Sequence, residues 1–203
     1  MPAAVRPDKS FASEQKVPQT IAMNYTLRSI LACLAFLFIT ANLSAESPRL
    51  ESGKARDALN AMHGKPAPVL ALKGWINSKP LDLNALKGKI VVLDFWATWC
   101  GPCISAVPHT NEMKEKYAKK GVVIIGVCNQ RGSEKMAATV KAHGIKYPVA
   151  VDAGTNASYK VSSYPDYYLI DRKGILRWAD VANSEVEKAI EILLKEQPVK
   201  GKK

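Results

Sequence analysis

The chain has 203 residues, with 29 Lys and Arg against 18 Asp and Glu, a net charge of +11, and only four cysteines. This length suits one ordinary domain with extra segments, or at most two small domains, and the fractions of 47% hydrophobic and 23% charged residues exclude a disordered chain. Four cysteines exclude a disulfide-dense miniature scaffold, whereas the positive charge makes nucleic acid and an anionic membrane surface candidate partners.

The first 45 residues have the pattern of a secretory leader. An unbroken apolar run over Ile30–Ile39 follows the basic Arg28 and precedes Asn42–Ala45, where the residues become small or polar. A basic flank, a short apolar stretch and a small final residue are typical of a signal peptide. The run is too short for a transmembrane helix, which needs about 20 apolar residues. We therefore expect residues 1–45 to be an N-terminal extension plus signal peptide, cleaved after Ala45.

Alternatives remain for this leader. Met23 immediately precedes the pattern, so a start there gives a signal peptide of ordinary length. An uncleaved leader would instead hold the protein at the membrane through residues 24–45, and lipidation of Cys33 is disfavoured because apolar sequence continues beyond it. Without the leader the chain keeps 25 basic and 16 acidic side chains, a net charge of +9.

The exported part begins with a short helical pattern over residues 46–63, which Pro66 and Pro68 end. Apolar residues over 69–76 and 81–83, separated by an Asn/Ser turn, predict a β-hairpin. The near-continuous β-branched run Ile90–Phe95 predicts a strand buried on both faces. The remaining predicted elements are a helix over 103–120, a strand over 122–127, a helix over 133–143, a strand over 147–151, a helical turn over 156–160, a hairpin of strands over 167–170 and 175–178, and an amphipathic helix over 184–195.

This order of elements predicts an α/β fold. Strands first alternate with helices and an antiparallel hairpin comes late, which indicates a three-layer sandwich with a mixed central sheet. The sequence shows no internal repeat and no second core. We expect a short N-terminal helix or linker over 46–65, one domain over 66–197 and a basic tail over 198–203.

Two cysteines define the candidate site. Cys100 and Cys103 follow the buried strand directly and open a predicted helix, with Gly101 and Pro102 between them. One helical turn brings their sulfurs within bonding distance. The positive end of the helix dipole favours the Cys100 thiolate, and thiols in such motifs have pKa values of about 3.5–7.5. A thiolate at this position can attack a disulfide of a partner, and Cys103 can then resolve the mixed disulfide.

Two other interpretations of this motif are weaker. A zinc site needs a second pair of ligands, and the three histidines stand alone and far apart, so we predict no metal. A purely structural disulfide is disfavoured at a strand-to-helix corner. Nucleic acid is also not expected as a partner, because no aromatic and basic residues are organised around the positive charge.

The stretch Trp96–Cys103, with the sequence WATWCGPC after an apolar strand, resembles the thioredoxin superfamily. The fuller pattern Lys87–Cys100 is similar to its exported branch, the TlpA/ResA-type thiol–disulfide oxidoreductases. The resemblance extends from about Gly64 to Gln197. It implies a thioredoxin-like fold, a redox-active Cys100–Cys103 disulfide and no further cofactor.

Other positions support the resemblance. Pro108 lies five residues after the second cysteine, where the helix of thioredoxins is kinked. Tyr164-Pro165 matches the cis-proline loop of the family, which packs against the cysteines and pairs with the substrate backbone. An isolated X–Pro bond is usually trans, so only the resemblance predicts the cis form here. The helix and strand over 133–151 match a βα insert before this loop in the exported branch.

Asp94 is an ionisable residue inside the apolar strand, so its pKa should be raised by burial. It matches the buried aspartate that helps to move the proton of the second cysteine in thioredoxin; the alternative is a simple hydrogen-bonding role near the sheet edge. Many exported relatives have a glutamate where this chain has Ala106. Acid–base assistance must then come from Asp94, and a close match to the cytochrome c maturation members is in doubt.

Aromatic residues flank the motif. We expect Trp99 to be exposed and to contact the partner, whereas for Trp96 both contact with the partner and a place in the core stay open. Of Tyr164, Tyr167 and Tyr168, at least one should face the site, although alternation along a strand prevents all three from doing so. With Gly101, Pro102 and Pro165, Trp99 and Tyr164 form the predicted substrate-binding set. Cys128 is predicted to be a small buried hydrophobe, with a redox role left open.

The sequence therefore predicts an exported protein-disulfide oxidoreductase, with Cys100 as nucleophile, Cys103 as resolving thiol and Asp94 as proton carrier. Its partners would be protein thiols or disulfides and an upstream membrane or periplasmic electron donor. The Gly-Pro pair between the cysteines favours a reductant. The alternatives are a thiol-dependent peroxidase, which the adjacent cysteine pair disfavours, and a non-catalytic module that holds a partner thiol or apocytochrome.

Overall fold

The structure is a computed structural model that describes residues 46–196. The predictions for the signal peptide, its cleavage site, the alternative start at Met23 and the basic tail over 198–203 lie outside the described residues. Within the described part of the chain, no helix is both long enough and apolar enough to cross a membrane.

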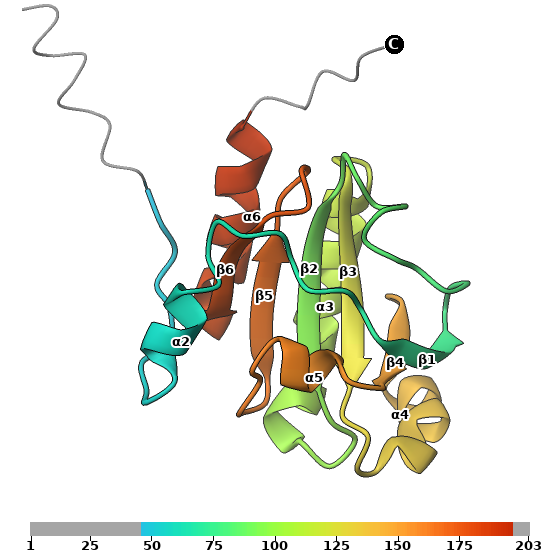
Figure 1. Cartoon of the computed structure of the whole chain (residues 1–203). Helices are drawn as coiled ribbons and strands as arrows, with labels where there is room; N and C mark the ends of the chain where they lie inside the picture. Colours follow the sequence, from blue (N-terminus) through green and yellow to red (C-terminus); the bar gives the residue numbers. More distant parts are fainter. Residues whose placement is uncertain (1–45, 197–203) are drawn as a thin grey trace, which may run out of the picture. The chain divides into compact units, whose positions relative to one another are not determined.

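Six strands and several helices make up the described chain (Figure 1). The strands are β1 (Leu72–Ile76), β2 (Ile90–Trp96), β3 (Val122–Cys128), β4 (Val149–Asp152), β5 (Asp166–Ile170) and β6 (Leu176–Val181). The helices are α2 (Arg56–Asn60), α3 (Gly101–Ala118), α4 (Met136–His143), α5 (Thr155–Ser158) and α6 (Val186–Lys195), with short 3-10 helices at Ser133–Lys135 and Asn183–Glu185.

The strands form one mixed sheet with the order β1-β4-β3-β2-β5-β6. β3 pairs parallel with both β2 and β4, whereas β1 pairs antiparallel with β4 and β5 pairs antiparallel with both β2 and β6. The predicted mixed sheet and the late hairpin, which joins β5 to β6, are confirmed.

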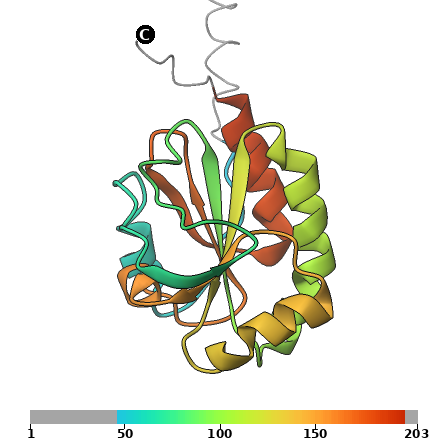
Figure 2. The ribbon, with the colours of Figure 1, turned by 90° about the vertical axis from the view of Figure 1, so that its right-hand side faces the viewer.

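Helices cover both faces of the sheet and give three layers. In Figure 2 the yellow-green α3 and the red α6 lie on one side of the sheet, and the cyan α2 and orange α5 lie on the other. Each face buries its own hydrophobic cluster: one includes residues of α3, α4 and α6, and the other includes Leu59 of α2 and Tyr159. The predicted α/β sandwich is therefore confirmed.

The position of β2 between two layers of helices explains why its sequence is a nearly continuous apolar run. All seven of its residues are buried. Alternate side chains enter opposite clusters, because Val92 and Trp96 belong to the cluster beneath α3 whereas Leu93 and Phe95 belong to the other. A strand with helices on both sides needs apolar residues at nearly every position, so the single carboxyl of this strand, on Asp94, is exceptional.

The predicted N-terminal β-hairpin is wrong. β1 pairs with β4, and residues 81–83 form no strand. Asn77 ends β1 with a left-handed φ of 66°, and its side-chain amide donates to the carbonyls of Ile145 (2.8 Å) and Tyr147 (3.0 Å) just before β4. These bonds hold β1 beside β4. Pro80 offers no N–H to a ladder, and the carboxylate of Asp82 accepts two backbone N–H groups that close a turn instead.

The predicted helix over residues 46–63 is also wrong for most of its length, because only Arg56–Asn60 are α-helical. The preceding residues lie along the edge of β6, where Leu50 forms a bridge with Val181. The guanidinium of Arg56 donates to the carbonyl of Ala179 at 2.9 Å. The free backbone groups of an edge strand thus draw this segment into an extended form that its helical periodicity does not reveal.

Candidate functional site

Cys100 and Cys103 lie at the first turn of α3 and form a disulfide, with Cα atoms 5.3 Å apart. Cys100 is the N-cap residue of the helix, and its Sγ accepts the backbone N–H of Cys103 at 3.2 Å. Gly101 and Pro102 are exposed, whereas both cysteines are only 5% exposed. The disulfide therefore lies at the positive end of an 18-residue helix, just beneath the exposed Gly101 and Pro102.

The loop before β5 lies at the same end of the sheet. β5 runs antiparallel to β2, so the start of β5 meets the end of β2, from which the chain enters α3 (Figure 1). The Tyr164–Pro165 peptide in this loop is cis, as the resemblance predicts. The structure thus brings together the two segments, about 60 residues apart in sequence, that carry most of the predicted site residues.

Trp99 and Tyr164 connect these two segments. Their rings meet edge to face, with centroids 5.8 Å apart. Trp99 is 49% exposed, which confirms its predicted exposure, and Tyr164 is half-buried. The Tyr164 hydroxyl accepts the side-chain amides of Asn129 (2.6 Å) and Asn156 (2.5 Å). These two asparagines are missing from the prediction, although Asn129 follows β3 at the edge where β2 also ends.

The loop Asn129–Gly132 is a third segment at this edge. The indole N–H of Trp99 donates to the carbonyl of Arg131 at 2.9 Å, and the Thr98 hydroxyl donates to the carbonyl of Gly132 at 2.8 Å. The backbone N–H of Asn129 donates to the carbonyl of Trp96 at 2.8 Å. The residues before the disulfide are thereby fixed to the loop that follows β3.

Asp94 is 3% exposed, and its side chain enters the core that contains both cysteines, because Val92 and Trp96 on the same face of β2 belong to that core. The Tyr147 hydroxyl donates to its Oδ2 at 3.3 Å. Burial raises the pKa of Asp94 to about 7, and the hydrogen bond from Tyr147 opposes this effect. The predicted burial and raised pKa are confirmed, and its role in proton transfer stays a prediction.

The three tyrosines divide as strand alternation requires. Tyr164 is at the site, Tyr167 belongs to the cluster that includes Cys103, and Tyr168 belongs to the opposite cluster. Tyr167 is directly opposite Asp94 in the ladder between β5 and β2. Only one of the three tyrosines therefore contacts the exposed rim formed by Trp99.

Cys128 ends β3 and is the free cysteine of the described chain. It is fully buried opposite Trp96, so the predicted burial of Cys128 is confirmed. Trp96 is 2% exposed, which decides between its two alternatives in favour of the core. Burial raises the pKa of the Cys128 thiol to about 12. A thiol with such a pKa is almost wholly protonated at neutral pH and is a poor nucleophile.

A second buried carboxyl, absent from the prediction, follows the cis-proline directly. Asp166 is 2% exposed, and burial, followed by the charge of Asp180, raises its pKa to about 8. Asp180 forms an ion pair with Arg56 at 3.7 Å. The position of Asp166 next to Pro165 is the only signal in the sequence that could have identified it.

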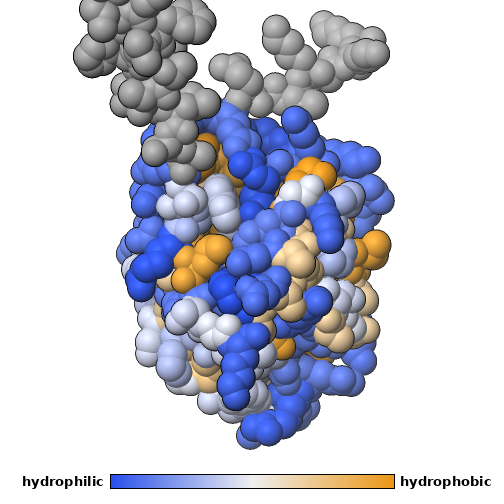
Figure 3. Space-filling view, turned by 60° about the vertical axis from the view of Figure 1, so that its left-hand side comes forward, coloured by the Kyte–Doolittle hydropathy of each residue, from blue (hydrophilic) through white to orange (hydrophobic). Residues whose placement is uncertain are grey.

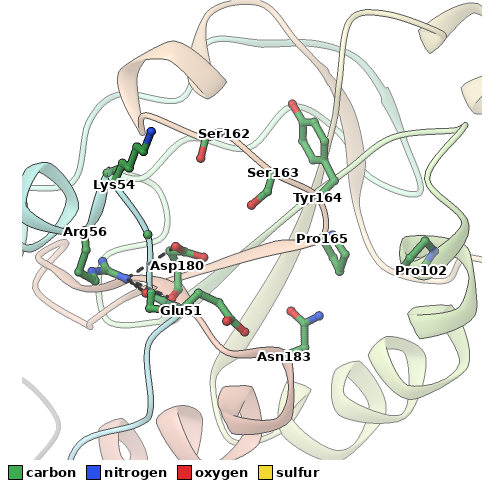
Figure 4. A pocket seen from close by; sticks show the side chains of 13 residues that line it. Glu51, Lys54, Arg56, Pro102, Ser162, Ser163, Tyr164, Pro165, Asp180 and Asn183 are labelled. Atoms are coloured by element: carbon green, nitrogen blue, oxygen red, sulfur yellow. Dashed lines mark hydrogen bonds and ion pairs between the residues drawn. The ribbon is translucent and has the colours of Figure 1, made fainter.

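A groove of about 610 Å³ leads along the surface to the first turn of α3. One wall is the N-terminal segment Glu51–Arg56, and the other is the loop Ser162–Pro165 together with Pro102. Figure 4 shows the Ser163 hydroxyl and the Asn183 amide turned towards the space between these walls. Polar and apolar groups line the groove in similar measure, and it reaches Pro102 next to the disulfide.

The rest of the surface offers few alternative sites. Figure 3, which brings the α2 side of the domain forward, shows mostly hydrophilic side chains with small, separate hydrophobic spots. Among residues 46–196, no group of three or more His, Cys, Asp or Glu side chains is placed to hold a metal ion. The disulfide and the adjoining loops are thus the best-defined chemical site in the described chain.

A disulfide at the head of a helix, beside a cis-proline loop and on a mixed sheet covered on both faces, defines a thioredoxin-like domain. Comparison with known proteins is consistent with this class: the model of the AhpC/TSA family matches residues 63–179. The chain belongs to this family.

Two curated relatives illustrate the similarity. Thiol-disulfide oxidoreductase ResA of Bacillus cereus is 40% identical over 113 residues, which are 55% of this chain and 65% of that protein. Thioredoxin-like protein YneN of Bacillus subtilis is 34% identical over 126 residues, which are 61% of this chain and 74% of that protein. The match therefore covers somewhat less than two thirds of the length of the ResA relative.

Solved structures agree on the fold. A putative thiol:disulfide interchange protein DsbE from Chlorobium tepidum has a TM-score of 0.58 and 30% sequence identity, and the match covers 65% of this chain and 97% of that chain. A thiol-disulfide isomerase from Corynebacterium glutamicum has a TM-score of 0.57 and 27% identity, with 64% and 98% of the two chains covered. Both similarities support the predicted thioredoxin-like fold.

Proposed function

We propose that this protein is an exported thiol–disulfide oxidoreductase that reduces disulfides of partner proteins through the Cys100–Cys103 pair. The observation that carries the proposal is the disulfide at the head of α3, close to the cis Tyr164–Pro165 peptide. The printed names of the ResA and DsbE relatives support the same reaction class.

The proposed reaction begins from the dithiol. The Cys100 thiolate attacks one sulfur of the substrate disulfide, a bond forms between the two sulfurs, and the substrate's other sulfur leaves as a thiolate that takes up a proton. Cys103 then loses its proton, and its thiolate attacks the Cys100 sulfur. The bond between Cys100 and the substrate breaks, and the second substrate sulfur leaves as a thiolate that takes up a proton. The substrate leaves as a dithiol with two electrons gained, and the protein is left with the Cys100–Cys103 disulfide.

Cys100 is assigned as the nucleophile because of its position at the helix N-terminus. Its Sγ lies 3.2 Å from the backbone nitrogen of Cys103, whose N–H points to it. A hydrogen bond and the helix dipole both favour the thiolate over the thiol and so lower the pKa of Cys100 in the dithiol form. Cys103 lies inside the first turn, and we propose that it resolves the mixed disulfide.

Asp94 is proposed to accept the proton of Cys103. Its pKa of about 7 allows it to be unprotonated in part of the population at neutral pH and still to take up a proton. Its side chain enters the same core as Cys103. Ala106, a turn further along α3, supplies no carboxyl group for this step.

The substrate polypeptide is proposed to lie over the exposed Trp99, Gly101 and Pro102 and the half-buried Tyr164 and Pro165 around the disulfide. The groove between Glu51–Arg56 and Ser162–Pro165 extends this surface. Its serine hydroxyls and backbone groups offer hydrogen bonds to an extended chain, which suits a polypeptide better than a small apolar ligand.

Export, the reducing direction and the electron donor are further parts of the proposal. The leader pattern in residues 1–45 supports a periplasmic or other extracytoplasmic location, either free or anchored through residues 24–45. A protein that reduces partners must itself be reduced, so we propose a dithiol donor at the membrane or in the periplasm. Measurement of the reduction potential of the Cys100–Cys103 pair tests the direction, because reductants of this fold lie near the lower end of about −270 to −120 mV.

The test of the proposed function compares the wild type with Cys100→Ser in the reduction of a protein disulfide. We expect catalysed reduction by the wild type and only the uncatalysed rate with Cys100→Ser. Equal rates would overturn the proposal. Consumption of hydrogen peroxide in place of disulfide reduction would support the peroxidase alternative, and stable thiol capture without turnover would support the binding alternative.

A further inference from the structure

The loop Asn129–Gly132 carries a cation to the rim of the disulfide. The guanidinium of Arg131 lies over the ring of Trp99, 4.7 Å from its centroid, while the Trp99 indole N–H donates to the Arg131 carbonyl. Trp99 therefore contacts both the main chain and the side chain of Arg131. Because Trp99 immediately precedes Cys100, this cation stands beside the residue proposed as the nucleophile.

The backbone that presents Arg131 is fixed. The Arg131 N–H donates to the side chain of Asn129 at 2.8 Å, and that side chain also donates to the Tyr164 hydroxyl. Gly132 has a φ of 84°, and a Cβ at this position would lie 2.7 Å from the Thr98 hydroxyl oxygen. The loop Asn129–Gly132 therefore packs so closely against Thr98 that position 132 has no space for a side chain.

The charge of Arg131 is not neutralised by the domain. Arg131 is exposed, and within residues 46–196 it forms no ion pair with a carboxylate. Glu134, the nearest carboxylate along the sequence, is also not its ion-pair partner. A guanidinium held on an aromatic face keeps its outward N–H groups free for a planar acceptor.

We propose that Arg131 is a specificity-determining residue that binds a carboxylate of the substrate polypeptide, next to the cysteine that Cys100 attacks. This inference rests on the proposed function and names the class of substrate: disulfides flanked by Asp or Glu. In the mixed disulfide the residues on either side of the substrate cysteine lie against the rim of Trp99 and Tyr164. A carboxylate there can accept two N–H groups from one guanidinium.

The charge of the whole domain acts in the same direction. Residues 46–196 carry 22 basic and 16 acidic side chains, a net charge of +6. A positive domain attracts acidic partners during diffusional encounter, and a fixed cation beside the nucleophile then selects among them. Both effects decrease as salt screens the charges.

The test uses three synthetic peptides with the same disulfide and a fluorophore–quencher pair, in which the residue before the attacked cysteine is Glu, Gln or Lys. Protein is reduced beforehand, freed of reductant and mixed with each peptide in a stopped-flow instrument. Each rate constant is divided by the rate constant for 2-mercaptoethanol with the same peptide. This division corrects for differences between the peptides in the intrinsic reactivity of their disulfides. We expect the Glu peptide to react about three- to fivefold faster than the Lys peptide. A ratio of this size corresponds to the free energy that one exposed ion pair contributes.

Three variants of Arg131 and one control decide the origin of this ratio. Arg131→Gln should remove most of the preference and leave only the small part due to the charge of the domain, Arg131→Glu should invert the ratio, and Arg131→Lys should retain most of it. Lys173→Gln serves as the control, since it changes the net charge equally but lies in the turn between β5 and β6, at the other end of β5 from Pro165. It should leave the ratio as in the wild type.

The outcomes separate this inference from the proposed function. If the wild type reduces all three peptides at equal normalised rates, the role of Arg131 is wrong and the reductase activity stands. If Arg131→Gln folds with an unchanged circular dichroism spectrum and keeps the wild-type ratio, the role is wrong as well. If the wild type reduces none of the peptides and no protein disulfide, the proposed function itself fails.

Discussion

The ring of Tyr164 meets the indole of Trp99 edge to face, with centroids 5.8 Å apart and ring planes at 89°. One residue belongs to the loop with the cis peptide and the other directly precedes Cys100. Edge-to-face pairs contribute about 0.5–1.5 kcal/mol beyond the burial of their surface. This pair therefore links the proposed nucleophile to the proposed substrate loop, and the hydrogen bonds of Tyr164 hold it in place.

Loss of the Tyr164 hydroxyl should lower activity as well as stability. Tyr164→Phe removes the acceptor of the Asn129 and Asn156 amides, and we expect the free energy of unfolding to fall by about 1–2 kcal/mol. Tyr159→Phe is the matched control, because it loses a comparable bond to the Pro68 carbonyl (2.7 Å) within the opposite cluster. Urea unfolding and disulfide reduction are measured for both variants. The role of the network is wrong if Tyr164→Phe is as active as Tyr159→Phe.

Substitution of Gly132 should be more costly than that of Gly144. Both glycines have left-handed φ angles, 84° and 61°, so both alanine variants carry a backbone strain of about 1 kcal/mol. A Cβ at Gly132 also meets Thr98 Oγ1 at 2.7 Å and Trp99 Cδ1 at 3.0 Å, whereas nothing lies within 4 Å at Gly144. We expect Gly132→Ala to lose about 2–4 kcal/mol in urea unfolding. Equal losses in the two variants would contradict the close packing of this loop.

The Asp94 carboxyl should make the resolving step pH-dependent. Deprotonated Asp94 accepts the proton of Cys103, so the release of reduced substrate from a preformed mixed disulfide should accelerate as pH rises through about 7. In Asp94→Asn this acceleration is lost, and release at pH 8 should slow by about tenfold or more. Stopped-flow measurement of product release between pH 5 and 9 checks this. An unchanged profile in Asp94→Asn would assign the proton to another acceptor.

The same carboxyl should lower stability at neutral pH. In the folded state Asp94 stays protonated up to about pH 7, whereas in the unfolded chain it loses its proton near the ordinary pKa of 3.8. The free energy of unfolding therefore falls as pH rises between these two values. Asp94→Asn removes this loss. We expect the variant to be more stable than the wild type at pH 8, on the order of 2–4 kcal/mol, and to gain much less at pH 4.5. A gain of the same size at both pH values would show that Asp94 is not protonated in the fold.

Part of the fold could be predicted because its signals are local. The run Ile90–Phe95 is apolar at nearly every position, which only a strand between two layers requires. The spacing of the two cysteines at the head of a predicted helix indicates redox chemistry, and the resemblance of Trp96–Cys103 to the thioredoxin superfamily implies the fold around it. The β5–β6 hairpin followed in the same way from a compact turn sequence.

The errors concern partners that are distant in sequence. β1 pairs with β4, more than 70 residues away. Hydrogen bonds from the Asn77 side-chain amide support this pairing, and no local sequence pattern predicts them. Asn129, Asn156 and Asp166 enter the site only because separate loops meet at one edge of the sheet. Periodicity describes which face of an element is apolar, and it does not describe which loop lies opposite a given side chain.

The assignment of Cys100 as nucleophile is tested most directly by trapping. Reduced Cys103→Ser is incubated with a protein disulfide, quenched with an alkylating reagent and analysed by mass spectrometry after digestion. We predict a stable mixed disulfide that joins the substrate to Cys100, with none at the buried Cys128, and no such adduct in Cys100→Ser. An adduct that forms on Cys128, or on Cys103 in Cys100→Ser at the same rate, would contradict the account.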